Sequence, residues 1–311
     1  MPDVGKHKAL PLRVMSLPVS LLIGLALGSF IGLFAYLRGS LTRSGVLGAI
    51  LTGTAIFGFG GFVPGILLIA FFVSSTLWSK YQARAKENVA EKFQKGSRRD
   101  LGQALANGAW AALLAIGYWF AASNSLDERA VHFFFGAFVG AMATVTADTW
   151  ATEIGVLSKA LPRMISTGRV VSAGTSGGIT VLGTVTALLG AMFIGAMVNI
   201  ANALGFVAAQ ISIPNVASVF AWSATVSGIG IIFIASISGL AGALFDSLLG
   251  ATVQAIYFSE YDERQTEKQF DSQGKPTRLI RGWRWLDNDW VNFFASVFGS
   301  LVAGVLAILF L

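Results

Sequence analysis

The sequence predicts an all-α fold, a polytopic transmembrane helical bundle of about seven to eight spans that forms one integral membrane domain over residues 1–311. Hydrophobic residues make up 54% of the chain and charged residues only 12%, whereas soluble domains carry roughly 25% charged residues. Apolar runs recur at about the 20 residues that an α-helix needs to cross a bilayer. Many of the 36 glycines lie within these runs, where small residues allow helix backbones to approach closely in lipid.

The apolar runs place the expected spans along the chain. In order, these spans cover residues 17–37, 44–59, 62–79, 101–122, 130–147, 178–202, 217–240 and 290–310. The first run follows Lys6, Lys8 and Arg13 and resembles a signal peptide, but it is too long and lacks a persuasive cleavage site. We therefore assign it as the first membrane helix. The second, third and fifth runs are short, which suits tilted or broken elements.

The run at residues 240–258 needs a separate argument, because Asp246 and Gln254 interrupt its apolar character. If this run re-enters the membrane without crossing it, 18 Lys and Arg residues lie on one side and four on the other. If it crosses as an additional span, the count becomes 12 against 10. The positive-inside rule favours the larger asymmetry. We therefore predict a re-entrant helix, with Asp246 lining a wet cavity.

This topology places the long polar loops at residues 80–100, 149–177 and 259–289 in the cytoplasm. The first of them has helix-forming composition and is expected to lie as a short helix on the lipid surface. The third is the most polar part of the chain and is expected to be disordered or a mobile lid. It ends in NDWVN, where Asn288 or Asp289 is the expected N-cap of the last helix.

The net charge of +6 is explained by membrane orientation. The basic residues lie between apolar runs, so we expect them to face anionic lipid and the cytoplasm rather than a nucleic acid. The sequence thus predicts a multi-pass protein, and its expected location is the cell (plasma) membrane.

The main candidate site begins at the end of the fifth apolar run. On an ideal helix Asp148, Thr149, Thr152 and Glu153 lie within an arc of about 140°. A carboxylate in hydrocarbon needs a cation or water. The chain has no cysteine and only two histidines, so any metal should be bound by oxygen, and Mg²⁺ is the expected ion.

Basic residues and a glycine-rich loop follow the acids. The candidate phosphate-binding residues are Lys159, Arg163, Arg169, Gly174, Thr175, Ser176, Gly177 and Gly178. Backbone amides in such a loop can face an anion, and the combination indicates a metal-nucleotide or metal-diphosphate site. Further candidates are Lys80 and Lys86 beside the third span, and Asp289 and Asn292 on one face of the last helix. The alternatives are a helix cap, ordinary loop composition and charges that only set topology.

Four segments, ADTWATEIG, LPRMISTGRVVSAGTSGG, FDSLLGATVQ and NDWVN, occur in this order. Together they resemble the transmembrane-protein-19-like family of integral membrane proteins, which includes plant phytyl-phosphate kinase. The resemblance covers about residues 39–304. It implies transfer of a phosphoryl group from a nucleoside triphosphate, with CTP as the expected donor, to a prenyl monophosphate such as phytyl phosphate.

With this resemblance, Asp148 and Asp246 are interpreted as Mg²⁺ ligands that approach within bridging distance, and Glu153 as a further ligand or an orienting base. The basic residues would neutralise phosphate charge, and the prenyl tail would lie between glycine-rich helices, open to lipid. A secondary transporter remains an alternative, since such proteins also use intramembrane acids and broken helices. A membrane protein without chemistry is another, although it leaves Asp246 as an unexplained cost.

Overall fold

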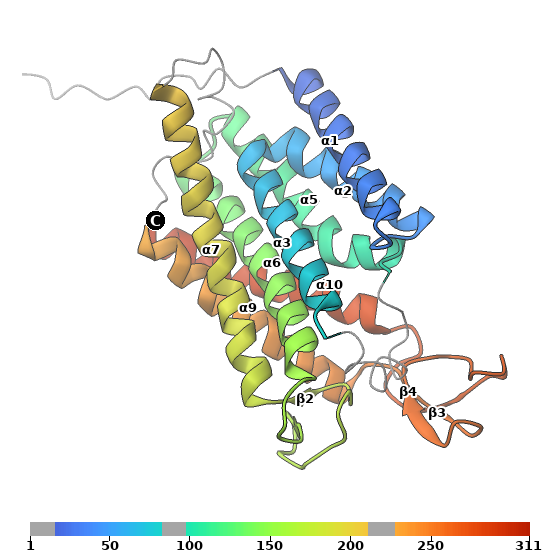
Figure 1. Cartoon of the computed structure of the whole chain (residues 1–311). Helices are drawn as coiled ribbons and strands as arrows, with labels where there is room; N and C mark the ends of the chain where they lie inside the picture. Colours follow the sequence, from blue (N-terminus) through green and yellow to red (C-terminus); the bar gives the residue numbers. More distant parts are fainter. Residues whose placement is uncertain (1–15, 83–97, 211–227) are drawn as a thin grey trace, which may run out of the picture.

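The computed structural model describes residues 16–82, 98–210 and 228–311. The helices of this part are α1 (Leu17–Leu37), α2 (Arg43–Gly60), α3 (Phe62–Lys80), α5 (Leu101–Ser123), α6 (Glu128–Gly155), α7 (Val181–Gln210), α9 (Ile229–Thr252) and α10 (Asn288–Phe310). Seven of these helices are long and apolar enough to span a membrane, and α2 is the exception. The helices lie side by side in a bundle (Figure 1). The predicted all-α polytopic fold is confirmed.

Most of the expected spans coincide with helices to within a few residues. The sixth span begins at Val181, after the glycine-rich loop, and not at residue 178. The fifth span is longer than expected, because α6 continues past residue 147 to Gly155. The acidic segment Asp148–Glu153 therefore lies within a membrane helix and not in the loop that follows it.

The prediction for residues 217–258 is wrong. Residues Ile229–Thr252 form the single continuous helix α9, which replaces the expected span at 217–240 and the expected re-entrant helix at 240–258. Residues 217–227 lie outside the described part. Asp246 lies within this helix, and the charge of Asp148 on α6 acts on its carboxylate. Gln254 follows the C-cap residue, Val253.

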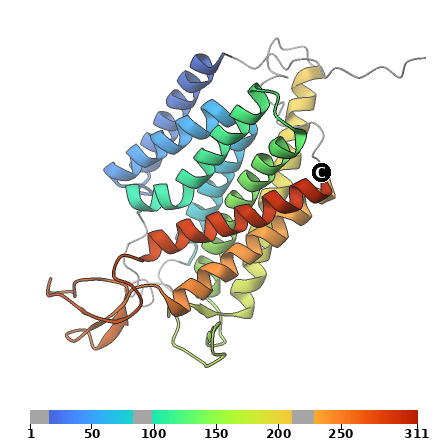
Figure 2. The same ribbon diagram turned by 180° about the vertical axis from the view of Figure 1, so that it is seen from behind.

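The predicted sidedness of the loops survives this correction. One crossing by α9 returns the chain to the end of the bundle at which α6 ended, as the re-entrant arrangement also would have done. The segments after α6 and after α9 lie at the same end of the bundle in both views (Figures 1 and 2). The asymmetry of 18 against four basic residues is therefore retained.

Helix α6 lies at the centre of the bundle, with a continuous buried stretch from Phe135 to Ala147. Glycines let its neighbours approach closely. A Cβ added to Gly242 of α9 would lie 2.3 Å from Thr144 Oγ1, and one added to Gly299 of α10 would lie 2.0 Å from the same atom. Both helices thus contact α6 at Thr144, where only glycine leaves enough room.

Two small antiparallel sheets lie at the loop end. Strand β1 (Arg163–Met164) pairs with β2 (Gly178–Ile179), and β3 (Ile256–Ser259) is the central strand between β4 (Arg264–Thr266) and β5 (Arg278–Arg281). The expected disorder in residues 259–289 is therefore wrong, because strand pairing and the burial of Tyr257 order this segment.

The expected surface helix at 80–100 lies mostly outside the described residues, and so does Lys86. The N-cap of α10 is Asp287, which precedes both expected residues, Asn288 and Asp289.

Candidate functional site

Asp148 and Asp246 lie on two helices that run in the same direction. Gly239 packs on Ala143 and Gly242 on Thr144, so residue numbers rise together along α9 and α6. Asp148 and Asp246 each follow the Thr144–Gly242 contact by four residues, one helical turn. The two carboxylates are close enough for their charges to interact. Their approach within the distance that one metal ion bridges stays a prediction.

The carboxylate of Asp246 has an unusual environment. Its Oδ2 atom is buried and has no hydrogen-bond partner among the described residues. The charges of Asp148 and Glu267 both act on it, and both of these residues are acidic like Asp246 itself. An anionic oxygen buried beside like charges is costly unless a cation or a proton compensates it. This arrangement indicates a cation site.

Glu153 lies in a different contact. It accepts a hydrogen bond from Ser79 Oγ of α3 at 2.5 Å, and its charge acts on Arg99. Five residues of a helix turn through about 500°, so Asp148 and Glu153 point about 140° apart. Helix α6 therefore directs Asp148 towards α9 and Glu153 towards α3. Across the described residues, no three His, Cys, Asp or Glu side chains are placed to hold a metal ion together, so the three predicted ligands do not form one cluster.

The two hydroxyls predicted beside these acids have less distinctive positions. Thr149 Oγ1 donates a hydrogen bond to the carbonyl of Val145 at 2.7 Å, within the same helix. Thr152 is exposed. These contacts are those of ordinary helix threonines.

The glycine-rich loop docks on the C-terminal end of α9. A Cβ added to Gly177 would lie 2.4 Å from the backbone nitrogen of Ala251, and one added to Gly250 would lie 2.7 Å from Ser176 Oγ. Gly250 is one turn beyond Asp246. The loop backbone turns at Gly174 and Gly177, which have φ angles of +74° and +84°, a conformation that favours glycine. The loop therefore contacts α9 about one helical turn beyond Asp246.

Part of the predicted amide cradle is used within the loop. The backbone N–H of Thr175 donates to Ser172, and that of Gly178 donates to Thr175. The N-terminus of α7 is capped separately, because Thr180 Oγ1 accepts a hydrogen bond from the N–H of Gly183 at 2.9 Å. The Gly177 part of the loop, which packs against Ala251 of α9, is thus the part at which an anion could meet both the loop and α9.

Three residues that the sequence did not single out as site residues join this region. Ser176 Oγ donates to Gln254 Oε1, and Gln254 Nε2 donates to Glu267 Oε1 at 3.0 Å. Arg281 Nη2 donates to the carbonyl of Gly250 at 2.6 Å, and burial lowers the pKa of Arg281. Gln254 was visible in the sequence only as an interruption. Glu267 and Arg281 carry no local signal, because the β-sheet alone brings them to α9.

The remaining candidates lie further out. Lys159, Arg163 and Arg169 are exposed, and Arg163 Nη1 donates to the carbonyl of Gly168 at 2.9 Å. Lys80 donates to the carbonyl of Arg38 at 3.3 Å. On α10, Asp289 is in the first turn and Asn292 is half-buried. The structure thus gathers the Asp148, Asp246 and Ser176–Gly177 candidates and leaves the basic ones on the loop surface.

A groove of about 840 Å³ lies between α3, α6 and α7, with a largely apolar lining. Trp78 and Trp150 line it with their rings 5.7 Å apart, and Trp150 Nε1 donates to Ser74 Oγ at 3.2 Å. Lys80 lines it at the last turn of α3, one residue from the Ser79 that contacts Glu153. The volume is typical of a ligand site, and the lining suits an apolar chain.

These features define a class: a multi-pass membrane protein with buried carboxylates near the end of the bundle that carries its basic loops. The chain belongs to the integral membrane protein family DUF92, whose model matches residues 26–300.

Three curated proteins illustrate the family relationship. The chain is 30% identical to Protein PGR of Arabidopsis thaliana over 294 residues, which cover 93% of this chain and 96% of PGR. It is 29% identical to Uncharacterized membrane protein MJ0933 of Methanocaldococcus jannaschii, over 86% of this chain and 85% of that protein. It is 27% identical to Protein VTE6, chloroplastic, of Arabidopsis thaliana, over 85% of this chain but 64% of VTE6. No solved structure matches the chain.

Proposed function

We propose that this protein is a membrane-embedded prenyl-phosphate kinase. It transfers a phosphoryl group from a nucleoside triphosphate, with CTP as the proposed donor, to a prenyl monophosphate such as phytyl phosphate. The observation that carries the proposal is the unpartnered, buried Oδ2 of Asp246 beside the charge of Asp148. The motif resemblance to the phytyl-phosphate kinase family supplies the substrate class.

The carboxylates fit Mg²⁺ as the proposed ion. Mg²⁺ is commonly held by one or two carboxylates together with water and substrate phosphates, so a group of three acids is not required. Asp148 and Asp246 would hold the ion. Ser176 and Gly177 of the glycine-rich loop contact α9 at Gly250, which is one helical turn beyond Asp246. The bound ion would neutralise charge on the phosphate oxygens.

In the proposed reaction an oxygen of the prenyl monophosphate attacks the terminal phosphorus of the nucleotide. A new P–O bond forms, and the bond from that phosphorus to the bridging oxygen breaks, so the nucleoside diphosphate leaves with the bridging oxygen. Such transfer asks the protein for alignment and charge neutralisation more than for a covalent nucleophile. Arg281 and the free amides of the glycine-rich loop, which meet α9 one turn beyond Asp246 at Gly250, would orient phosphate oxygens.

The groove between α3, α6 and α7 is the proposed place for the prenyl chain. Its apolar wall leads to Lys80, a cation suited to the acceptor phosphate. A transporter gains no support from this geometry, because transporter sites lie near the bilayer midplane. Asp148 and Asp246 lie seven and six residues before the ends of their helices, or about 10 Å. The proposed bilayer is the plasma membrane.

Asp148→Asn tests the proposal. If Asp148 is a metal ligand, turnover should fall about 10²-fold or more, because the metal neutralises charge in the transition state. Asp127→Asn, at the other end of α6, is the matched control, since Asp127 caps that helix and Asn caps as well as Asp. The assay is Mg²⁺-dependent conversion of prenyl phosphate to diphosphate, followed by mass spectrometry with CTP, GTP and ATP. A folded Asp148→Asn protein with wild-type turnover would remove Asp148 from the site.

A further inference from the structure

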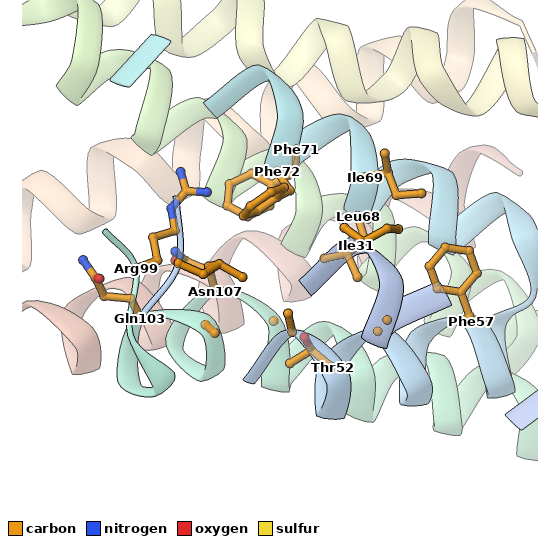
Figure 3. A pocket seen from close by; sticks show the side chains of 16 residues that line it. Ile31, Thr52, Phe57, Leu68, Ile69, Phe71, Phe72, Arg99, Gln103 and Asn107 are labelled. Atoms are coloured by element: carbon orange, nitrogen blue, oxygen red, sulfur yellow. The ribbon is translucent and has the colours of Figure 1, made fainter. Parts of the chain in front are cut away.

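A second, separate cavity lies between α1, α2, α3 and α5 (Figure 3). Its volume is about 70 Å³. Apolar side chains, among them Ile31, Phe57 and Leu68, form most of its lining. Arg99 and Asn107 lie together at the opposite end from Phe57 in Figure 3. The cavity is therefore amphipathic, with one cationic end and a long apolar remainder.

The backbone of Arg99 is held in place on both sides. Its N–H donates to the carbonyl of Ser40 at 3.1 Å, and its carbonyl accepts from the N–H of Thr42 at 3.0 Å. These bonds anchor the start of α5 to the loop between α1 and α2. The guanidinium carbon lies 5.4 Å and 5.5 Å from the ring centroids of Phe71 and Phe72. The cation is thus directed between helices and away from the loop surface.

The guanidinium of Arg99 lacks a full set of partners. Its Nη1 atom is buried and has no hydrogen-bond partner within the described ranges. Burial lowers its pKa to about 10, while the charge of Glu153 acts in the opposite direction, so Arg99 stays charged at neutral pH. A buried, cationic N–H donor without a partner, at the end of an otherwise apolar cavity, indicates an anionic ligand.

The size of the cavity limits that ligand. One water occupies about 10–15 Å³ on this scale, so the cavity, at about 70 Å³, holds about five to seven groups of that size. This is room for a small head group or the first carbons of one chain, but not for two chains. The apolar lining excludes a free polar solute, because most of its surface would meet hydrocarbon.

From this geometry we infer that the cavity binds the anionic end of a single-chain lipid, a phosphate monoester or a carboxylate, with Arg99 as the anion-binding residue. Asn107 would supply an amide group at the same end, and Ile31 and Leu68 would contact the chain. The site does not include Asp148 or Asp246, so the inference does not depend on whether the protein is a kinase.

The test measures lipid binding to the purified, delipidated full-length protein by native mass spectrometry. The probes are geranylgeranyl monophosphate, oleate, neutral geranylgeraniol and the two-chain anion phosphatidylglycerol. Arg99→Met keeps the contact with the two phenylalanines but removes the charge. Arg38→Met is the matched control, because Arg38 is exposed and lies over Phe34 at 5.1 Å. Ala49→Leu fills the cavity without changing a charge.

We expect both single-chain anions to bind the wild type more tightly than geranylgeraniol does. Arg99→Met should weaken them about tenfold or more, the usual effect of losing a charged hydrogen bond, while Arg38→Met should change them less than twofold. Ala49→Leu should weaken them as well. Preference for the phosphate or for oleate then identifies the head group.

Two results would overturn the inference. One is wild-type affinity for both single-chain anions in a folded Arg99→Met protein. The other is Arg99-dependent binding of phosphatidylglycerol alone, which would assign the site to a two-chain membrane lipid. If Arg99→Met does not fold, lipid binding to Ala49→Leu and to the charge-retaining Arg99→Lys tests the inference instead. Unchanged binding in Ala49→Leu then refutes the cavity as the site.

Discussion

Asp246→Asn should raise the stability of the magnesium-free protein. The substitution keeps the shape of the side chain but removes a charge that is buried near Asp148 and Glu267. An acidic side chain within a membrane helix costs about 2.5–3.5 kcal/mol at the bilayer centre, and less near the end, where Asp246 lies. The polar amide retains part of this cost. We therefore expect a gain of about 1–2 kcal/mol, or about 2–8 °C in the unfolding midpoint by the scaling for large domains.

Mg²⁺ should reverse the order of stability. An ion that binds only the folded wild type adds about 2.7 kcal/mol at 100 times its dissociation constant. The same addition should do little for Asp246→Asn, because one of the two proposed ligands has lost its charge. Wild type should thus be the less stable protein without Mg²⁺ and the more stable one with it, and the mutant should lose prenyl-phosphate kinase activity.

The assay is thermal unfolding in detergent across a Mg²⁺ titration, with Asp127→Asn as control. That variant removes a carboxylate from the opposite end of α6 and should follow the wild type at every concentration. The reasoning is refuted if Asp246→Asn has the wild-type midpoint without Mg²⁺ and gains as much as the wild type when the ion is added.

Two further predictions follow from packing and topology. Gly299→Ala should lower the free energy of unfolding by about 1–3 kcal/mol, because the new Cβ would lie 2.0 Å from Thr144 Oγ1. Gly230→Ala, which has nothing within 4 Å, should be neutral or slightly stabilising, and equal midpoints for the two variants in thermal unfolding would contradict this packing. Single cysteines at Ser166 and Gln273, introduced into this cysteine-free chain, should react with a membrane-impermeant maleimide from the same side. Labelling from opposite sides would show that α9 does not cross as described.

Helix positions were largely predictable because each span has its own local signal. The run at 17–37 coincides with α1, Leu17–Leu37, since hydropathy and length suffice where the chain enters and leaves lipid. The same signal misled at 217–258. There, Asp246 reduced the local hydropathy, which led to the prediction of a separate re-entrant helix. The local sequence does not show whether another helix packs against such a charged residue.

The candidate site was predictable only in part. The resemblance and the apolar setting pointed to Asp148, Asp246 and the glycine-rich loop, and the structure places these near one another. Periodicity placed Glu153 on the same arc as Asp148, but an arc of about 140° is wide enough to face two different neighbours. The contact with Ser79, which lies 74 positions away in the chain, assigns Glu153 to α3.

The sequence by itself determined that this protein folds in a membrane and determined the length of most of its helices, and it predicts the side on which the basic loops lie. These properties depend on composition summed over about 20 residues and on loop charges, which do not require knowledge of neighbours. The tertiary structure alone decided which polar groups meet. Arg281 reaches Gly250, Gln254 reaches Glu267, and the guanidinium of Arg99 lies between helices, because strand pairing and glycine contacts join residues that are distant in the chain. Contacts of this kind depend on how the helices and strands pack, and a pattern along the sequence does not describe that packing.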